Sequence, residues 1–303
     1  MTLHSARVIV VAAVVVGASM LLPIVHARQT IDEQRALAEQ GDAVAQHGVG
    51  YSYWVGLEGR QDDGEASRWF RRAADQGHAD AQFFLGAMYE RGRHVREDLD
   101  EAAHWYRRAA GQGHAAAQFR LAGLYERGQG VPQDGAEAIR WYLQAASHGL
   151  TDAGYSLSLI FAQGRRVPRD DDGGDRWLRL AAEQGHTDAQ FQLGTQYLKA
   201  RGGARTADGV RWYRQAAQQG HADAQYNLGY MYAQGSGVPQ DDTEAIRWYR
   251  LAADQGHAGA RASLGFMNAK ACGWVDPVAW TGVGGLRIRA LGWVPPPGCP
   301  GSP

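Results

Sequence analysis

The sequence predicts an all-α fold, a right-handed α/α superhelix (solenoid) of about six helix-turn-helix repeats. Three observations predict it. A glycine in a Gln-Gly-His-like signature recurs every 35 or 36 residues, and a tryptophan recurs in phase with it. Within each unit, apolar residues follow helical spacing on two segments that a Gly- and Pro-containing loop separates. The glycines are Gly41, Gly77, Gly113, Gly149, Gly185, Gly220 and Gly256, and the tryptophans are Trp69, Trp105, Trp141, Trp177, Trp212 and Trp248.

The first 27 residues differ from the repeats. Arg7 precedes an apolar run from Val8 to Leu22, and Val25-His26-Ala27 follows. This order is typical of a secretory signal with a small-residue cleavage site, here after Ala27. The signal predicts a periplasmic or secreted protein. The alternative is an uncleaved N-terminal membrane anchor, because the run approaches the lower length limit of a spanning helix.

Residues 28–44 are predicted to form an N-terminal capping helix, followed by repeats over 45–259. The first helix of a unit is exemplified by Ala81–Tyr89, where alanine, leucine, methionine and tyrosine form one apolar stripe. Gly86 lies within this helix, where glycine is less favourable than alanine by about 1 kcal/mol. Its recurrence predicts close approach of a neighbouring helix. The predicted units are 45–80, 81–116, 117–152, 153–188, 189–223 and 224–259.

A loop such as Gly128–Asp134 should end the first helix, because Gly favours a helix C-terminus and Pro cannot continue it. The aspartate is then expected to cap the second helix. An acidic residue follows it at the spacing of a capping box. Trp141 and its counterparts, among alanines, are expected in the core. The capping pairs are Asp62 with Glu65, Asp98 with Glu101, Asp134 with Glu137, and Asp241 with Glu244.

Several segments depart from the pattern. Ser158 replaces the mid-helix glycine in the fourth unit, and residues 200–204 replace the usual loop in the fifth, which makes them the expected flexible point. Residues 260–303 are predicted to be a partial repeat and an irregular Gly/Pro/Trp-rich tail. Its two cysteines, Cys272 and Cys299, are expected either to pair or to stay free.

These residues resemble the Sel1-like repeat family, a relative of the tetratricopeptide repeat. The pattern A-x-x-x-L-G-x-x-Y-x-x-G-x-G-V-x-x-D-x-x-x-A-x-x-W-Y-x-x-A-A-x-x-G is matched almost throughout by residues 117–149 and 224–256. The resemblance implies an α-solenoid whose first helices line a concave groove. It also implies a protein that binds protein partners and is implicated in signalling, envelope assembly or host contact.

Composition and motifs exclude several other functions. The 31 basic and 32 acidic residues balance to a net charge of −1, which disfavours nucleic-acid binding. The sequence contains no nucleophile elbow, P-loop or dinucleotide motif. We therefore predict no catalytic residue, cofactor or metal. Asp170-Asp171-Asp172 lacks the spacing of a calcium loop and indicates a helix start.

A histidine follows the signature glycine in most units. Adjacent copies are expected about 20 Å apart, two helix diameters, so they cannot share a metal ion. Their position favours interactions with helix C-termini. The series is His78, His114, His186, His221 and His257.

The remaining candidate is a surface. If the first alanine of each unit is position one, positions four, seven and eleven vary while their neighbours stay fixed. These positions fall within about 60° on a helix and form one stripe. We call them the variable stripe and predict that it contacts a partner. The predicted partner-binding residues are Phe84, Arg91, Arg120, Arg127, Gln192, Lys199, Asn227, Tyr230 and Gln234.

The predicted function is that of an exported interaction scaffold or adaptor in the cell envelope, non-enzymatic and without cofactors. One alternative is a periplasmic regulator that binds a sensor domain. A second is a weak hydrolase of β-lactam or cell-wall substrates, by resemblance to a cysteine-rich branch of the family. No repeat here carries the cysteine pair of that branch.

Overall fold

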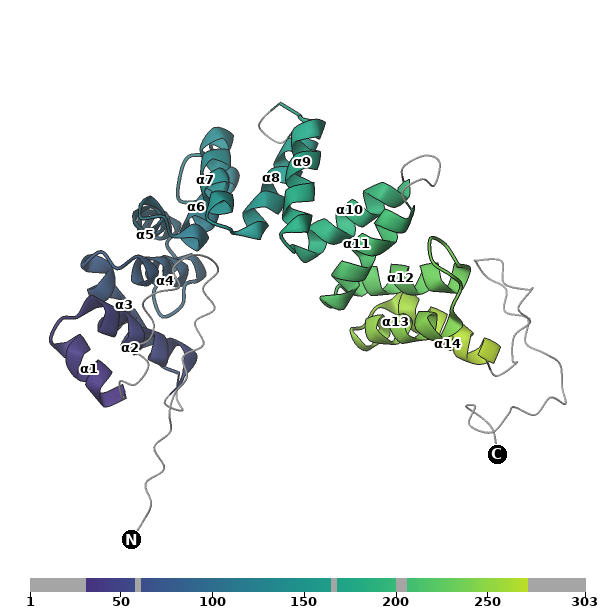
Figure 1. Cartoon of the computed structure of the whole chain (residues 1–303). Coiled ribbons are helices and arrows are strands. Elements are labelled where there is room, and N and C mark those ends of the chain that lie inside the picture. Colours follow the sequence, from purple (N-terminus) through teal and green to yellow (C-terminus); the bar gives the residue numbers. More distant parts are fainter. Residues whose placement is uncertain (1–30, 58–60, 165–167, 200–205, 272–303) are drawn as a thin grey trace, which may run out of the picture. The chain divides into compact units, whose positions relative to one another are not determined.

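The computed structural model describes residues 31–57, 61–164, 168–199 and 206–271 (Figure 1). This part of the chain contains fourteen α-helices and no β-strand. The helices are α1 (Ile31–Glu39), α2 (Ala43–Val55), α3 (Asp63–Asp75), α4 (Ala79–Arg91), α5 (Leu99–Gly111), α6 (Ala115–Arg127), α7 (Gly135–Ser147), α8 (Thr151–Gln163), α9 (Asp171–Glu183), α10 (Thr187–Lys199), α11 (Thr206–Gln218), α12 (Ala222–Gln234), α13 (Asp242–Asp254) and α14 (Ala258–Ala271). The predicted all-α repeat architecture is confirmed.

The chain divides into two compact units, at the junction of Trp177 and Leu178, and each is described by itself. Successive helices pack side by side within each unit, as α4 packs against α5 and α12 against α13 (Figure 1). Helix α1 lies ahead of the first pair, and α14 is the first helix of a seventh repeat. None of the helices described is long and apolar enough to cross a bilayer.

Several predictions lie outside the described residues. They concern the N-terminal segment 1–27, the loop 200–204, and the tail that contains Cys272 and Cys299.

The imidazoles of the histidine series cap helix N-termini, while the predicted C-terminal interaction is made by the backbone, as when His78 N–H donates to the carbonyl of Ala73 at 3.1 Å. His78 has extended backbone angles, and its Nδ1 accepts a hydrogen bond from the backbone N–H of Ala81 at 3.4 Å. An imidazole acceptor thus satisfies one of the free N–H groups of the first turn. Each first helix therefore begins two residues before its position-one alanine. The same bond is made by His114, His186, His221 and His257.

The second helices begin at the predicted aspartates, but without a full capping box. Asp134 Oδ1 accepts from the backbone N–H groups of Ala136 and Glu137, at 2.9 and 3.1 Å. Its own N–H donates to the carbonyl of Tyr125 at 3.0 Å. The glutamate is turned outward to the guanidinium of Arg140. The aspartates therefore tie each second helix to the preceding first helix. Asp170 caps α9 in the same way, through Gly173 N–H at 2.8 Å.

Tryptophans and alanines fill the core as predicted. Trp141 is 7% exposed and lies in a cluster with Tyr142, Ala145 and Leu157. The mid-helix glycines admit a facing aromatic ring: a Cβ on Gly86 would lie 2.8 Å from Cδ1 of Tyr106. Close helix packing thus explains why an unfavourable residue recurs there.

A second set of fixed positions forms a glutamine ladder that links the repeats. Gln82 is 1% exposed, and its Nε2 donates to the carbonyl of Ala74 at 3.0 Å. Its Oε1 accepts from Nε2 of Gln112, at the end of the next second helix, at 2.8 Å. The other rungs are Gln46 with Gln76, Gln118 with His148, Gln190 with Gln219, and Gln225 with Gln255. These bonds connect three consecutive helices at each step.

Candidate functional site

In the first compact unit, the variable stripe is more buried than predicted. The ring of Phe84 is half-buried and stacks on Phe70, with centroids 5.0 Å apart and planes 8° apart. Tyr51 meets the same ring edge-on at 5.7 Å. Ala87 is only 7% exposed, and Gly123 is buried. The expectation that packing leaves these positions free is therefore wrong for positions four and seven of the second repeat and position seven of the third.

The three arginines that the variable stripe has in this unit lie among acidic groups. Arg91 and Arg127 are exposed at the ends of α4 and α6, and Arg120 is half-buried. Burial and a hydrogen bond to Glu90 raise the pKa of Tyr106, while the nearby charges of Arg120 and Arg91 oppose that rise.

The third repeat has the same arrangement. Tyr142 donates to Glu126 Oε2 at 3.0 Å. Burial, more than Glu126, raises the pKa of Tyr142, and the charge of Arg127 opposes the rise. Two carboxylates at position ten thus accompany the three guanidinium groups. The three arginines, which by themselves would form a basic patch, therefore belong to a patch of mixed charge.

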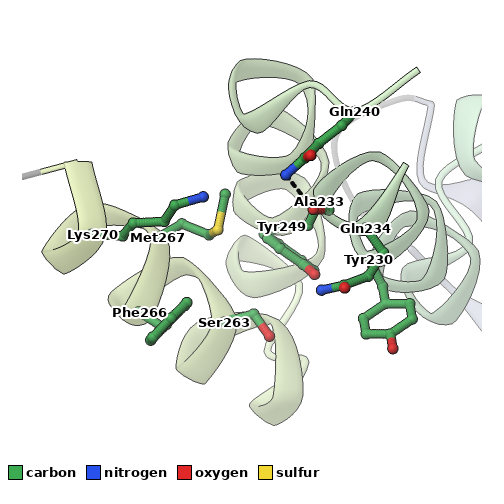
Figure 2. Close-up of a pocket in the computed structure, with 9 residues that line it drawn as sticks. All are labelled: Tyr230, Ala233, Gln234, Gln240, Tyr249, Ser263, Phe266, Met267 and Lys270. Carbon is green, nitrogen blue, oxygen red and sulfur yellow. Dashed lines mark hydrogen bonds between the residues drawn. The ribbon is translucent and has the colours of Figure 1, made fainter. Parts of the chain in front are cut away.

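In the second compact unit, Tyr230 is 46% exposed, and Lys199 and Gln234 are also exposed. Gln192 and Asn227 are half-buried. Tyr230 and Gln234 line a cavity of about 230 Å³ formed by α12, α13 and α14 (Figure 2). Asn227 is not among its lining residues.

Helix α14 completes this cavity with its own variable positions. Ser263, Phe266 and Lys270 stand at positions four, seven and eleven of the seventh repeat. They line the cavity from α14, opposite the helix that carries Tyr230 and Gln234 (Figure 2). The predicted stripe ends at Gln234, although a partial repeat is predicted from residue 260. Counting positions from Ala260 would have identified all three residues.

The cavity offers groups suited to recognition. Burial, followed by the neighbouring Tyr226, raises the pKa of Tyr249 to about 12, so its hydroxyl is neutral and can donate a hydrogen bond. Gln240 Nε2 donates to the carbonyl of Ala233 at 3.1 Å, and Lys270 Nζ donates to Asp242 Oδ2 at 2.6 Å (Figure 2 draws the first bond). Amide, hydroxyl and aromatic groups line the space, and the charge of its lysine is balanced by Asp242.

One side-chain cluster lies at the junction of the first two repeats and includes one histidine of the series, His78. One ligand atom each from His47, His78 and Asp80 lie within 4.8 Å of one another. His114 Nε2 is 3.1 Å from Asp80 Oδ1, so a single carboxylate lies between consecutive repeats. The partner of His78 in this cluster is His47, which stands outside the histidine series. The signal in the sequence was His47, at a position where other repeats carry phenylalanine or tyrosine.

Comparison with known proteins agrees with this architecture. The Sel1 repeat pattern matches residues 43–78, 79–114, 115–150, 151–186, 187–221 and 222–257. The crystal structure of c5321, described as a protective antigen present in uropathogenic Escherichia coli strains displaying an SLR fold, is 36% identical. Its TM-score is 0.73, and the match covers 80% of this chain and 52% of that one, so this chain spans about half of that protein's length.

A Sel1 repeat protein from Oxalobacter formigenes is 34% identical with a TM-score of 0.53, over 78% of this chain and 79% of that one. No curated protein matches the sequence. Six matched repeats, each coinciding with a helix pair of the structure, show that the chain belongs to the Sel1 repeat family.

Proposed function

We propose that this chain is a scaffold that holds a protein partner on the variable stripe of its first helices. Sel1-repeat proteins are generally protein-interaction scaffolds. The observation that carries the proposal here is the cavity in the second compact unit. Variable positions of two successive repeats line it, together with fixed core residues such as Tyr249 and Met267.

The cavity sets the kind of contact that the partner makes. At about 230 Å³ it accepts one large side chain, and its phenol, amide and hydroxyl groups favour one that is aromatic or carries an uncharged polar end. Tyr230, half exposed beside it, is the residue type that most often anchors an interface. The mixed-charge patch of the first unit adds orientation more than affinity, since exposed ion pairs contribute little.

We further propose that the scaffold acts after export, in the periplasm or outside the cell. The support is the basic start, apolar run and Val25-His26-Ala27 site of the N-terminal segment. A membrane-anchored form follows if the segment is not cleaved, and the partner then meets the scaffold at the membrane surface.

Site-specific photo-cross-linking in cells tests the binding face. A photoreactive phenylalanine analogue placed at position 230 should give one dominant protein adduct. The matched control carries the analogue at position 251, where an exposed leucine of α13 lies outside the cavity lining. Equal adducts at both positions would refute the stripe as the binding face.

Variants then separate the two halves of the stripe. Tyr230→Ala should reduce capture of the cross-linked partner by about 2 kcal/mol in binding free energy, a typical value for an anchoring tyrosine. Charge reversal of Arg91, Arg120 and Arg127 to Glu should leave helicity unchanged and reduce capture less. If truncation after Ala271 abolishes capture while both variants retain it, the C-terminal tail is the binding site.

A further inference from the structure

The cluster at the junction of the first two repeats departs from the pattern of the others. At three later junctions an aromatic ring at position three stacks on the capping histidine of the next repeat, as Phe83 stacks on His114 with centroids 4.7 Å apart. That histidine's Nε2 also faces an aspartate just before position one of the preceding repeat, as in the 3.1 Å contact between His114 and Asp80. The same two contacts join Phe191, Asp188 and His221, and Tyr226, Asp223 and His257.

Two substitutions change this arrangement in the first repeat. Val44 stands where the aspartate should be, and His47 stands where the aromatic residue should be. The ring of His47 stacks on His78 in the usual way, with centroids 4.7 Å apart and planes 17° apart. His78 has therefore lost its aspartate and gained a second imidazole as a neighbour.

His47 carries a nitrogen for which packing supplies no partner. Its Nε2 is buried and makes no hydrogen bond within the described part of the chain. A phenylalanine would fill the same space without an unpaired polar atom, and burying such an atom without a partner is unfavourable. This nitrogen can therefore bind a ligand that comes from outside the chain.

We propose that His47, His78 and Asp80 bind one divalent transition-metal ion, of which zinc is the representative, and that this ion joins the first two repeats. Two imidazoles and a carboxylate suit zinc and its neighbours, whereas calcium and magnesium prefer oxygen ligands alone. His47 comes from α2, and the other two residues come from the start of α4. The remaining coordination positions are open to water, because Asp80 lies at the surface.

The surrounding contacts leave suitable ligand atoms. His78 uses Nδ1 to cap α4, so Nε2 is its ligand. His114 holds Oδ1 of Asp80, an outer-shell contact of the kind that orients metal-binding carboxylates. Burial lowers the pKa of His47 to about 4 and also lowers that of His78, while the hydrogen bond from His114 lowers that of Asp80. At neutral pH all three groups are in the protonation state that binds metal.

Binding requires a small rearrangement of side chains. Bonds of about 2.0–2.2 Å place tetrahedral ligand atoms roughly 3.4 Å apart, closer than the 4.8 Å limit found here. One stacked imidazole must also turn so that both lone pairs point at the same ion. Neither change moves a helix, since the carboxylate is exposed and the imidazoles rotate about their own side-chain bonds.

Calorimetric titration of the purified chain, without a polyhistidine tag, with zinc chloride tests the proposal. We expect one site of micromolar or tighter affinity and a zinc-dependent rise in melting temperature. Replacing zinc by cobalt should give the visible absorption of a low-symmetry site, and magnesium should give no response. His47→Phe restores the residue type found in other repeats, so it should keep the helical circular dichroism and weaken zinc binding by more than about tenfold.

Two further variants complete the test. His104→Phe removes an exposed histidine elsewhere and should bind zinc as the parent does. Asp80→Asn keeps the packing of both imidazoles and should also weaken binding by more than about tenfold, which preserves the test if His47→Phe folds poorly. Equal zinc affinity in the parent, His47→Phe and Asp80→Asn would overturn the proposal, as would no binding by the parent.

Discussion

Replacing Gln82 by Leu should destabilise the protein by about 1–3 kcal/mol. The substitution removes two hydrogen bonds, from Nε2 to the carbonyl of Ala74 and from Gln112 to Oε1, each of which contributes about 0.5–1.5 kcal/mol. Leucine fills most of the same buried volume, and the carbonyl of Ala74 keeps its bond from Gly77 N–H. The expected loss therefore reflects the ladder and not a cavity or an orphaned acceptor.

The neighbouring rung residue shows whether the two glutamines act together. Gln112→Ala removes the bond to Gln82 and a longer, exposed one to the carbonyl of Arg108 at 3.4 Å. It leaves the buried Oε1 of Gln82 without that donor, which should cost about 1–3 kcal/mol. The double variant should lose less than the sum of the single losses by about 0.5–1.5 kcal/mol, because both share one bond.

Urea denaturation followed by circular dichroism measures these changes, provided that the slope of the unfolding free energy against urea is unchanged. Gln218→Ala, at an exposed glutamine, serves as control and should change stability by less than about 0.5 kcal/mol. Additive losses, or a Gln82→Leu variant as stable as the parent, would refute the ladder as a source of stability.

Four other outcomes follow from the sequence and the packing. Trp141→Ala should lower the free energy of unfolding by about 3–5 kcal/mol in the same urea assay, and a loss below about 1 kcal/mol would contradict the core assignment. Trp141→Phe should cost clearly less, because it removes a buried Nε1 that lacks a partner in the described residues. His47 has its pKa lowered to about 4 by burial, so the unfolded chain gains a proton before the folded one as pH falls. Stability should thus be full above about pH 6.5 and decline between pH 6.5 and 4, by at most about 3 kcal/mol, and His47→Phe should flatten this part of the measured stability profile. Leu150→His should stabilise by about 0.5 kcal/mol, since Leu150 has the extended backbone of the capping histidines but no side-chain cap; a loss in urea denaturation would show that leucine packing outweighs the cap. N-terminal sequencing of the exported protein should begin at Arg28, and a product that retains Met1 would contradict cleavage.

Much of the fold could be predicted because packing between helices requires the same residue types at the same positions of successive repeats. An aromatic ring faces the mid-helix glycine in four repeats, as Tyr106 faces Gly86, and alanines pack beside the tryptophan, as Ala145 does in the cluster of Trp141, so these residues recur in register. The role of the histidine side chains could not be predicted because only three residues separate the two helices: α3 ends at Asp75 and α4 begins at Ala79. Sequence alone does not say which of the two termini the imidazole serves.

The site was harder to predict because variation has more than one cause. Phe84 varies relative to other repeats because it joins an aromatic cluster around Phe70, whereas Tyr230 varies on an exposed surface. Both give the same signal in a single sequence. Likewise, the carboxylates of Glu90 and Glu126 could not be predicted beside the arginines, because both residues lie at position ten, outside the variable stripe.

The departures of the first repeat illustrate how a repeat protein can gain a site without losing its fold. Several independent contacts hold the interfaces between repeats: the glutamine rung, the ring stacked on the capping histidine, and the aspartate before position one that contacts Nε2 of that histidine. In the first interface the rung between Gln46 and Gln76 is intact and the ring stack is kept by an imidazole of similar shape. Only the aspartate is missing, which frees the Nε2 of His78 for another partner. An imidazole in place of a phenyl ring keeps the packing of the interface and adds a nitrogen that can bind a metal. The reverse substitution, His47→Phe, should therefore remove metal binding without unfolding the protein.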